Sequence, residues 1–410
     1  MSATTTVIAD RAVFDEEGYM RVYPDIAQAV STGKWPSAWH HYLAHGAKEG
    51  RKANDLDEEF YLNAYPPARL AIAQKRAKSA IDHYLRIGRG CGFLPNRKAP
   101  RLPNPSGFSS PYGGLWIDQM NAASLIEGKQ QIGQITAEQA GQLQFFSEKG
   151  YIVLPGAVSA KHVTAARAEL DKAYMGGFPD LKFESNHVGK GQLSFHPDMR
   201  IHPAKALDLH FFSPAIRDVM FNPAITAFLG LIFDGKTFAS QTLGFLRGSA
   251  QEGHQDSAYV VYTLPRQFSA SWVALEDVTI GAGELFYYPG SHRFPDFHYG
   301  SGFKNVPEAR RMGTPEPALN EQVRKHVAQL EKRAAELGMK KETFAAKAGD
   351  VLIWHPELVH GGNPLSTKIT RKSLVTHYCA RYAAPVFGEH RGREVPVGEF
   401  QGHLWATDHY

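Results

Sequence analysis

The chain has 410 residues, enough for two or three domains of average size. Hydrophobic residues make up 43% of it and charged residues 21%, a globular composition that excludes a fibrous or disordered chain. The net charge of +4 is mild and no block of like charges occurs, so we expect no nucleic-acid partner.

Cysteine content and hydropathy indicate the cellular compartment in which we expect the protein. Two cysteines, Cys91 and Cys379, are too few for a disulfide framework and form no Cys-x-x-Cys pair for zinc. The N-terminus lacks the basic and apolar regions of a secretory signal. The longest apolar run, residues 224–233, has about half the length that crosses a bilayer. We therefore expect a cytoplasmic protein without a membrane span.

Residues 1–95 contain an internal repeat. The decapeptide DEEGYMRVYP at Asp15 returns 42 residues later as DEEFYLNAYP at Asp57. The same offset relates further residues: His41 and His83, Gly46 and Gly88, and Gly50 and Gly92. A fixed period of this length indicates a duplicated structural unit. We predict two copies of a short helical pair that ends at glycines.

The two copies resemble a small repeat with an HYL-x-x-G-x-x-EG ending that accompanies polysaccharide-related enzymes in bacteria. The first copy, HYLAHGAKEGR, matches this pattern better than the second. We interpret the pair as a packing or interaction module that could bind a protein or glycan partner. His41 and His83 are then expected to cap or pack helices.

Residues 96–133 are assigned to a linker, because proline, glycine, serine and asparagine cluster in NRKAPRLPNPSGFSSPYGG. A second domain is expected over residues 134–390 and a C-terminal tail over residues 391–410. Thr136 and Gln139 form a capping box at the start of this domain, and the following pattern predicts helix, strand, helix.

The remaining pattern of the second domain is mainly that of strands. Short segments rich in Val, Phe, Tyr, Trp and Thr, broken by Gly and Pro, occupy residues 237–282 and 345–384. Residues 320–337 between them have helical periodicity and predict a helical insertion near residues 305–340. The expected fold is mainly β with α: a double-stranded β-helix (jelly-roll) core flanked by helices and preceded by the small helical repeat domain.

A candidate metal site begins with His254 and Asp256. In an extended segment, side chains two residues apart point to the same side, so both can reach one ion. This spacing is weakly specific by itself, and it also occurs at His196 and Asp198. No strand pattern surrounds that second pair, so we place it in a loop.

A third ligand comes from AKAGDVLIWHPELVHGGNPLSTKITRKS, in which a buried strand leads to His360 and a following strand carries Arg371. Two imidazoles and one carboxylate on one face of a metal form the facial triad of iron(II) oxygenases. Three coordination positions then remain open for co-substrate and O₂. The sequence therefore predicts a mononuclear iron site at His254, Asp256 and His360.

Residues 136–380 resemble the phytanoyl-CoA dioxygenase family of Fe(II)- and 2-oxoglutarate-dependent oxygenases. The resemblance covers about 60% of the chain. It rests on the segments FFSEKGYIVLPGAVS, GHQDSAY, WVALEDVTIGAGELFYYPGSHR and GDVLIWHPELVHGG followed by TRKS.

Carried over residue by residue, the resemblance implies iron ligation by the same triad and 2-oxoglutarate binding by Arg371. A guanidinium suits a planar carboxylate. Three further residues match co-substrate positions of the family: Ser373, Trp272 and Gln241. This sequence departs from the family at Gly362, where a small hydroxyl residue is frequent. Tyr259, Tyr262 and His210 are candidates for the substrate pocket, whereas His292 in PGSHR is expected to be structural.

The resemblance implies Fe(II) as the metal and 2-oxoglutarate and O₂ as co-substrates, with succinate and CO₂ as by-products. Related halogenases replace the carboxylate ligand with a small residue, so Asp256 favours hydroxylation, or desaturation or cyclisation, of a small-molecule, lipid or saccharide substrate. The alternative is a non-catalytic family member, or a glycan- or protein-binding module that uses the N-terminal repeats. A broken triad would mark that alternative, and the triad is intact.

Overall fold

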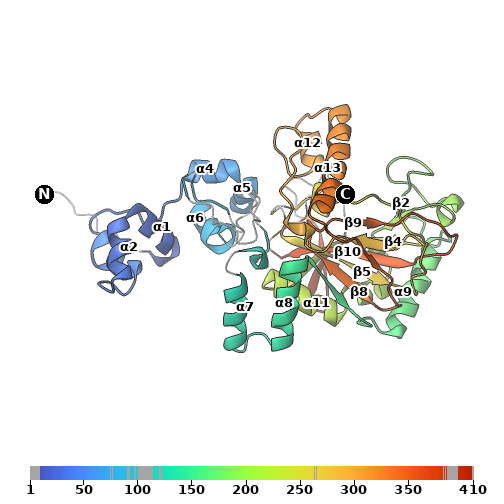
Figure 1. The fold of residues 1–410 in the computed structure, drawn as a ribbon, viewed down its shortest axis with the longest axis horizontal. Coiled ribbons are helices and arrows are strands. Elements are labelled where there is room, and N and C mark those ends of the chain that lie inside the picture. The colour runs from blue at the N-terminus through green and yellow to red at the C-terminus, as the bar shows by residue number, and fades with distance from the viewer. Residues whose placement is uncertain are drawn as a thin grey trace. The chain divides into compact units, whose positions relative to one another are not determined.

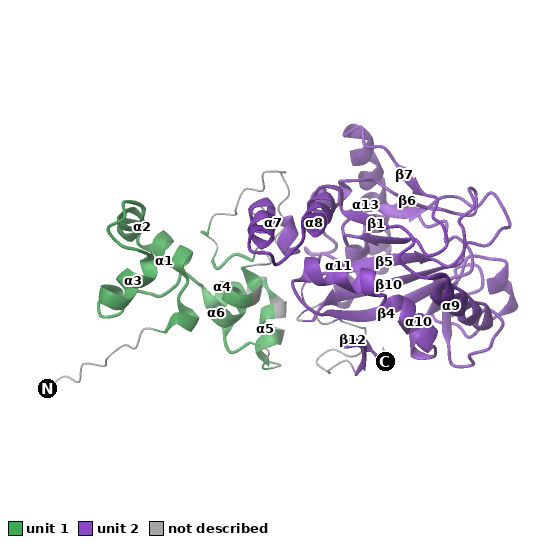
Figure 2. Cartoon of the chain, turned by 90° about the horizontal axis from the view of Figure 1, so that it is seen from below, with its two compact units in different colours: residues 1–103, 111–113 green, residues 104–110, 114–410 purple. Residues whose placement is uncertain are grey.

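The computed structural model describes residues 10–73, 75, 77–89, 93–96, 98–99, 114–119, 122–262, 264, 266–381, 383, 385 and 396–408. Cys91, Gly92 and residues 100–113 of the predicted linker lie outside this set. The chain divides into two compact units, which Figure 2 distinguishes by colour. The first contains residues 1–103 and 111–113, and the second contains residues 104–110 and 114–410.

The first unit is helical in its described part. It begins with a short 3-10 turn, η1 (Arg11–Val13), which precedes two series of helices at the same 42-residue offset. The first series is α1 (Glu16–Val22), α2 (Pro24–Ser31), α3 (Ala38–His41) and the π-helical turn η2 (Tyr42–Gly46). The second series is α4 (Glu58–Ala64), α5 (Pro66–Ala73), α6 (Ala80–His83) and η3 (Tyr84–Gly88).

Each series contains an equivalent hydrogen bond between a tyrosine and a histidine. Tyr19 Oη lies 3.1 Å from His41 Nδ1, and Tyr61 Oη lies 2.8 Å from His83 Nδ1. Both histidines are buried. Because a buried ring nitrogen needs a partner, each tyrosine fixes the histidine of its own copy. The repeated tyrosines and histidines of the sequence therefore pack the interior of each copy.

Ion pairs join the two copies to each other. Arg21 of the first copy donates to Asp55 at 2.8 Å, and Arg89 of the second copy lies 3.2 Å from the buried carboxylate of Asp15. Asn96 also donates to the Asp55 carbonyl oxygen. Ion pairs thus link the copies, whereas Phe14, Tyr19 and Tyr42 belong to an aromatic core within the first copy.

The second unit is mainly β with flanking helices (Figure 1). Its helices are α7 (Ala122–Gln131), α8 (Ala137–Lys149), α9 (Ala160–Ala173), α10 (Pro214–Met220), α11 (Pro223–Phe233), α12 (Val306–Arg311) and α13 (Glu316–Glu336). The capping box of Thr136 and Gln139 is present at the start of α8, which ends at Gly150 with a φ of 78°. The predicted insertion contains α12 and α13.

Two sheets form the β part. The larger has the strand order β1 (Tyr151–Leu154), β8 (Val351–Trp354), β5 (Phe268–Ala274), β10 (Ser373–Ala380), β4 (Thr237–Phe245), β12 (His403–Ala406) and β11 (Val397–Phe400). In addition, β2 (Lys182–Glu184) pairs with β3 (Lys205–Leu207), which pairs with β4. The smaller sheet has the order β7 (Glu342–Phe344), β6 (Leu285–Tyr287) and β9 (His360–Gly362).

Strand register determines which side chains share the interior of the β part. On β10, Val375 lies opposite Trp272 of β5 and Leu243 of β4. Val375 and Trp272 belong to the core cluster with Trp354, and Leu243 packs against it. Tyr378, also on β10, faces the opposite side of the sheet, because its hydroxyl donates to the Met220 carbonyl of α10. Because side chains alternate along a strand, Ser373 and His377 face the same interior as Val375.

Two segments assigned to the linker and the tail form regular structure. Residues 116–118 make the 3-10 turn η4 (Trp116–Asp118), and α7 follows within the predicted linker. Trp116 donates its indole N–H to the Leu231 carbonyl of α11. In the tail, β12 pairs in parallel with β4. Both segments gain their order from long-range contacts, which local composition does not register.

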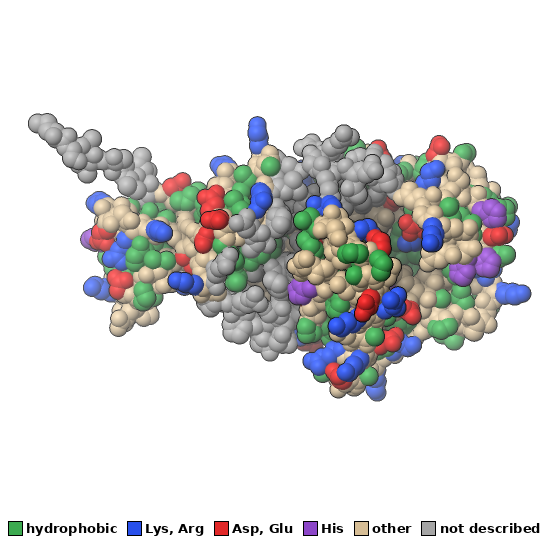
Figure 3. Space-filling view, turned by 90° about the horizontal axis from the view of Figure 1, so that it is seen from above, with side chains coloured by type: hydrophobic (Ala, Val, Ile, Leu, Met, Phe, Trp, Pro, Cys, Tyr) green, Lys and Arg blue, Asp and Glu red, His purple; other side chains and the backbone are tan. Residues whose placement is uncertain are grey.

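No single helix among the described residues is long and apolar enough to cross a membrane, although α10 and α11, bent by 51° at their junction, pass the same test as a pair. Figure 3 shows basic and acidic side chains interspersed over the face in view, in keeping with the mild net charge.

Gly46 tests the packing of the first repeat copy. A β-carbon at this position would clash with the hydroxyl of Tyr19 and lie 2.9 Å from the Tyr42 ring. Overpacking of this kind costs about 1 to 3 kcal/mol, so Gly46→Ala should destabilise this copy. We expect faster amide hydrogen exchange over residues 37–50.

Gly128→Ala is the matched control, because Gly128 lies within α7 and a β-carbon there meets nothing within 4 Å. The added methyl group should stabilise that helix by about 0.5 to 1 kcal/mol. Unchanged exchange over residues 37–50 in Gly46→Ala would contradict the packing described here.

Candidate metal centre

Backbone pairing brings the two predicted histidine ligands together. The amide of His254 donates to the His360 carbonyl oxygen at 2.9 Å, and the His360 amide donates back at 3.0 Å. This bridge extends the smaller sheet beyond β9. Asp256 follows at the start of the 3-10 turn η7 (Asp256–Ala258), which brings its carboxylate to the same place.

The three side chains can serve one ion. A ligand atom from each lies within 4.8 Å of the others, and all three residues are buried. Asp256 Oδ1 is 3.7 Å from His254 Nε2 and 3.6 Å from His360 Nε2. Such a cluster of two imidazoles and one carboxylate is the donor set of non-haem iron(II) oxygenases.

Surrounding hydrogen bonds fix which ligand atoms face the ion. Nδ1 of His254 lies 2.9 Å from the Glu252 carbonyl oxygen, and Nδ1 of His360 lies 2.9 Å from the Leu358 carbonyl oxygen. Each Nδ1 therefore carries the proton, which leaves the Nε2 lone pair for a metal. The Trp354 indole donates to Asp256 Oδ2 at 2.8 Å and leaves Oδ1 toward the histidines.

The electrostatics give Asp256 and His360 the protonation states that metal binding requires. Burial alone would raise the pKa of Asp256, but the imidazoles of His360, His254 and His377 hold this pKa well below its usual range. Burial lowers the pKa of His360 to about 4, against the opposing effect of Asp256. A carboxylate and neutral imidazoles are the forms that bind a divalent metal.

Arg371 gives the interior a buried cation. Its pKa is lowered by burial to about 10, against the effect of Glu284, so the guanidinium is charged at neutral pH. One nitrogen donates to the Gly283 carbonyl oxygen, and the group lies 5.5 Å from the Trp272 ring centroid. Among the described residues, no carboxylate lies within ion-pair distance of it. A buried charge without a partner is costly, so this site suits an anionic ligand.

Further unpaired polar atoms lie in the same interior. Within the described part of the chain, Arg371 Nε, Ser373 Oγ and Trp272 Nε1 are buried and have no hydrogen-bond partner. Native proteins leave few such groups unsatisfied, and the exceptions mark functional sites. Two N–H groups and a hydroxyl beside a cation fit the distal carboxylate of 2-oxoglutarate. The residues present therefore fit both the metal and the co-substrate that the sequence predicts.

Comparison with known proteins identifies the family. The phytanoyl-CoA dioxygenase (PhyH) family model matches residues 146–373, more than half of the chain. The chain belongs to the phytanoyl-CoA dioxygenase family. Fe(II) and 2-oxoglutarate are the metal and co-substrate of such a dioxygenase, and the donor set just described fits both.

Individual relatives are distant. "Phytanoyl-CoA dioxygenase 1" of Oryza sativa subsp. japonica is 24% identical over 275 residues, which cover 60% of this chain and 89% of that protein. Among solved structures, the α-ketoglutarate-dependent carbocyclase SnoK has a TM-score of 0.48 at 17% identity and covers 67% of this chain and 97% of its own. The epimerase SnoN, in complex with Fe³⁺ and α-ketoglutarate, has a TM-score of 0.46 at 19% identity and covers 63% and 91%.

The departure from the family at Gly362 has a steric counterpart. A β-carbon at this position would lie 3.1 Å from the Ala250 amide nitrogen and 3.1 Å from the Ser249 hydroxyl. Any side chain here would require its neighbours to shift. Glycine at this position thus matches the close approach of the segment at Ser249 and Ala250.

The remaining predicted pocket residues occupy three environments. Gln241 lies on β4 opposite His377, in the row that faces the interior. Tyr259 is 39% exposed beside His254, with ring centroids 5.9 Å apart. Tyr262 is buried, and its hydroxyl lies 2.5 Å from that of Ser240. Of these, Tyr259 is both exposed and next to a metal ligand.

His210 lies elsewhere. Its Nδ1 is 2.8 Å from Thr242 Oγ1, and its Nε2 is 3.2 Å from the Ala406 carbonyl oxygen of β12. It is fully buried. These contacts place it where β12 joins β4, so its visible role is to hold the C-terminal segment. The exposed pair His196 and Asp198 also lies outside the metal cluster.

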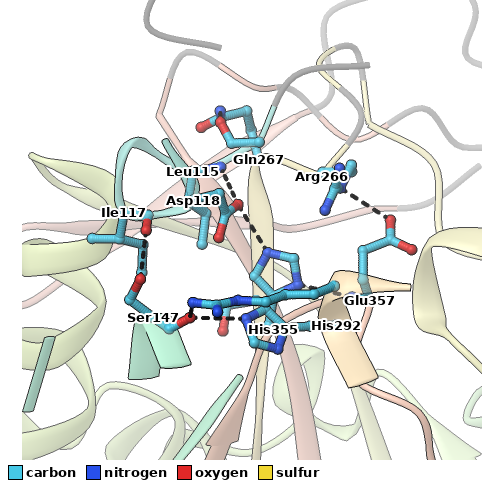
Figure 4. A network of polar contacts seen from close by, with 12 residues as sticks. Leu115, Ile117, Asp118, Ser147, Arg266, Gln267, His292, His355 and Glu357 are labelled. Carbon is cyan, nitrogen blue, oxygen red and sulfur yellow. Dashed lines mark hydrogen bonds and ion pairs between the residues drawn. The ribbon is translucent and has the colours of Figure 1, made fainter. Parts of the chain in front are cut away.

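The second unit also contains a buried polar network that the sequence did not reveal (Figure 4). His355, on the connection from β8 to β9, lies 3.0 Å from Asp118 of η4. His292 lies 3.1 Å from the Ser147 carbonyl oxygen and packs against His355. His292 is thus structural, as its PGSHR turn suggested. The sequence did not predict a role for Asp118, because the surrounding residues have the composition of a linker.

The other half of this network holds Glu357, two residues after His355. Glu357 lies 2.9 Å from Lys304 and 3.3 Å from Arg266. Its carbonyl oxygen accepts from the Gln255 side chain, and the neighbouring Pro356 carbonyl accepts from the Ser257 amide. The residues on both sides of Asp256 are therefore tied to the segment that ends at His360.

Asp118 should make stability depend on pH in the acid range. Burial alone would raise its pKa, but His355, Arg266 and His292 lower it to about 2. The pKa of an aspartate in the unfolded chain is about 3.9. Above a pH of about 3.9 the ionised carboxylate therefore adds about 2 to 3 kcal/mol to the free energy of unfolding, and this stabilisation is lost as the pH falls toward 2. Asp118→Asn should lower the free energy of unfolding at pH 7, and the deficit should shrink at pH 3.

Urea unfolding at both pH values measures this difference. The control is Asp234→Asn, because the Asp234 side chain is 63% exposed and pairs with Lys129 on the surface. An exposed ion pair contributes about 0 to 1 kcal/mol. An equal deficit in Asp118→Asn at pH 7 and pH 3 would show that the charge of Asp118 is not what stabilises the fold.

Proposed function

We propose that this protein is an Fe(II)- and 2-oxoglutarate-dependent hydroxylase of an unactivated C–H bond in a small-molecule, lipid or saccharide substrate. One observation carries the proposal: the same β interior holds the buried cluster of His254, Asp256 and His360 and the guanidinium of Arg371, which has no carboxylate within ion-pair distance among the described residues. The cluster supplies a metal site with open positions, and Arg371 supplies an anchor for a dianionic co-substrate.

These contacts indicate which role each residue would have in the reaction. When bound, Fe(II) with 2-oxoglutarate and O₂ supplies the oxidising power that inserts one oxygen atom into a C–H bond, while the other enters succinate and CO₂ is released. His254, Asp256 and His360 would hold the metal. Arg371 and Ser373 would bind the distal carboxylate of 2-oxoglutarate. The apolar walls of Trp272, Leu352 and Val375 would exclude water around it.

Asp256 bears on the type of reaction. Its carboxylate is held by the Trp354 indole and faces both histidines, so it fills one coordination position of a bound metal. A halide would need that position. The proposal is therefore transfer of a hydroxyl group, with desaturation or cyclisation as variants of the same chemistry.

The helical insertion supports a substrate site beside the metal. Ala258, two residues after Asp256, packs in one cluster with Tyr299, Val306, Ala309 and Leu319. The adjacent Tyr259 is partly exposed. The insertion thus contacts the metal-binding turn, and we propose that it forms one wall of the substrate site, with Tyr259 at the opening.

Replacement of Asp256 tests the metal site. Asp256→Ala should abolish Fe(II)-dependent succinate formation and iron binding, because two imidazoles alone hold the ion poorly. Asp198→Ala is the matched control, since it removes the carboxylate of the exposed His-x-Asp pair. It should leave iron content and succinate formation unchanged. Equal loss in both variants would refute the assignment.

Replacement of Arg371 tests the co-substrate site separately. Arg371→Gln should weaken 2-oxoglutarate binding by about 10- to 100-fold, because a charge-assisted hydrogen bond contributes about 1.5 to 3 kcal/mol. Iron binding should be retained. The measurement is anaerobic titration of the Fe(II) protein with 2-oxoglutarate, followed by the visible absorption band of the chelate.

Arg167→Gln, on α9, is the control for a changed arginine and should bind 2-oxoglutarate as the wild type does. If the wild-type protein binds iron but shows no such band, 2-oxoglutarate is not the co-substrate. If Arg371→Gln titrates like the wild type, the anchor lies elsewhere.

A further inference from the structure

Asp256 is contacted on the oxygen that faces away from the histidine ligands. The Trp354 indole donates to this atom, Oδ2, at 2.8 Å. His377 Nε2 lies 3.6 Å from the same atom. The two donors come from β8 and β10, which both pair with β5, and both residues lie opposite Ala270. The small side chain of Ala270 leaves room for Trp354 and His377 to reach the carboxylate from one row of the sheet.

The His377 ring is buried beside Phe268, with ring centroids 6.5 Å apart. It is 3% exposed, and its Nδ1 has no hydrogen-bond partner among the described residues. With the proton on Nδ1, a buried N–H group would have no acceptor and the bare Nε2 would face the carboxylate. With the proton on Nε2, only a bare nitrogen is left without a partner, which costs less free energy. The hydrogen-bond partners therefore favour a proton on Nε2, directed at Asp256.

We propose that His377 is a positioning residue that, together with Trp354, holds Asp256 for monodentate metal binding. The Trp354 N–H group donates to Oδ2, the His377 Nε2 atom lies 3.6 Å from the same oxygen, and Oδ1 is the oxygen that faces the histidine ligands. A carboxylate free to rotate could offer both oxygens and occupy a second position, one of the three that co-substrate and O₂ require. The inference rests on the proposed metal function and assigns a residue to it that the sequence motifs do not include.

Metal affinity measures this role without turnover. Partners that orient a metal ligand typically change affinity by about 10- to 100-fold when removed. His377→Phe fills the space but lacks a donor, so its Mn(II) dissociation constant should rise by about this factor. His377→Gln carries an amide N–H near the position of Nε2, and it should stay within about threefold of the wild type. A role in packing alone would favour the opposite order.

Mn(II) binding to the full-length protein is measured by electron paramagnetic resonance of the free ion, with circular dichroism to verify folding. Cys379→Ala is the matched control, because Cys379 is buried on the same strand two residues further along. It should bind Mn(II) with the wild-type constant. A wild-type constant in His377→Phe, or a loss in His377→Gln as large as in His377→Phe, would overturn the proposal.

A second pair of variants keeps the test decisive if His377→Phe fails to fold. His377→Asn places its amide nearer the position of Nδ1 and should lose affinity, whereas His377→Gln should retain it. Equal affinities in these two variants would overturn the role of Nε2. If the wild-type protein itself binds no Mn(II) or Fe(II), the proposed metal function fails, an outcome distinct from a wild type that binds and variants that match it.

Discussion

The reciprocal backbone hydrogen bonds between His254 and His360 set the geometry of the whole centre. They join two segments that are far apart in the sequence at the edge of the smaller sheet, and a shift of one residue would turn one imidazole to the other side. The strand β9 and the side-chain bond from Gln255 to Glu357 maintain this register. The metal site is thus a consequence of strand pairing more than of the ligands' own contacts.

Burial of charge is the second constraint on this interior. Glu357, Lys304 and Arg266 are all buried, and the contacts of Glu357 with the two cations reduce the cost of removing these charges from water. Arg371 differs, because no carboxylate lies within ion-pair distance of it in the described chain. Among the described residues, Glu357 thus pairs with Arg266 and Lys304, whereas the charge of Arg371 has no carboxylate counterion.

The sequence predicted those parts of the centre that lie in local motifs. His254 and Asp256 share a side of the chain by their spacing, and His360 follows an apolar strand, so the triad could be assigned without coordinates. His377 and Trp354 could not, because their nearness to Asp256 depends on the register of β10 and β8 against β5. Asp118 was not predicted, because the composition of its turn-rich stretch does not indicate a contact with His355, which lies after β8 far along the chain.

The pairing of the C-terminal segment affects how the larger sheet meets other molecules. One edge of β4 is bonded to β10, and its other edge is shared between β3 and the parallel strand β12. Without β12, the backbone amide and carbonyl groups near Phe238 and Ala239 would be open to strands of other chains. The last described strands therefore cover this part of the β4 edge and make the short strand β11 the end of the larger sheet.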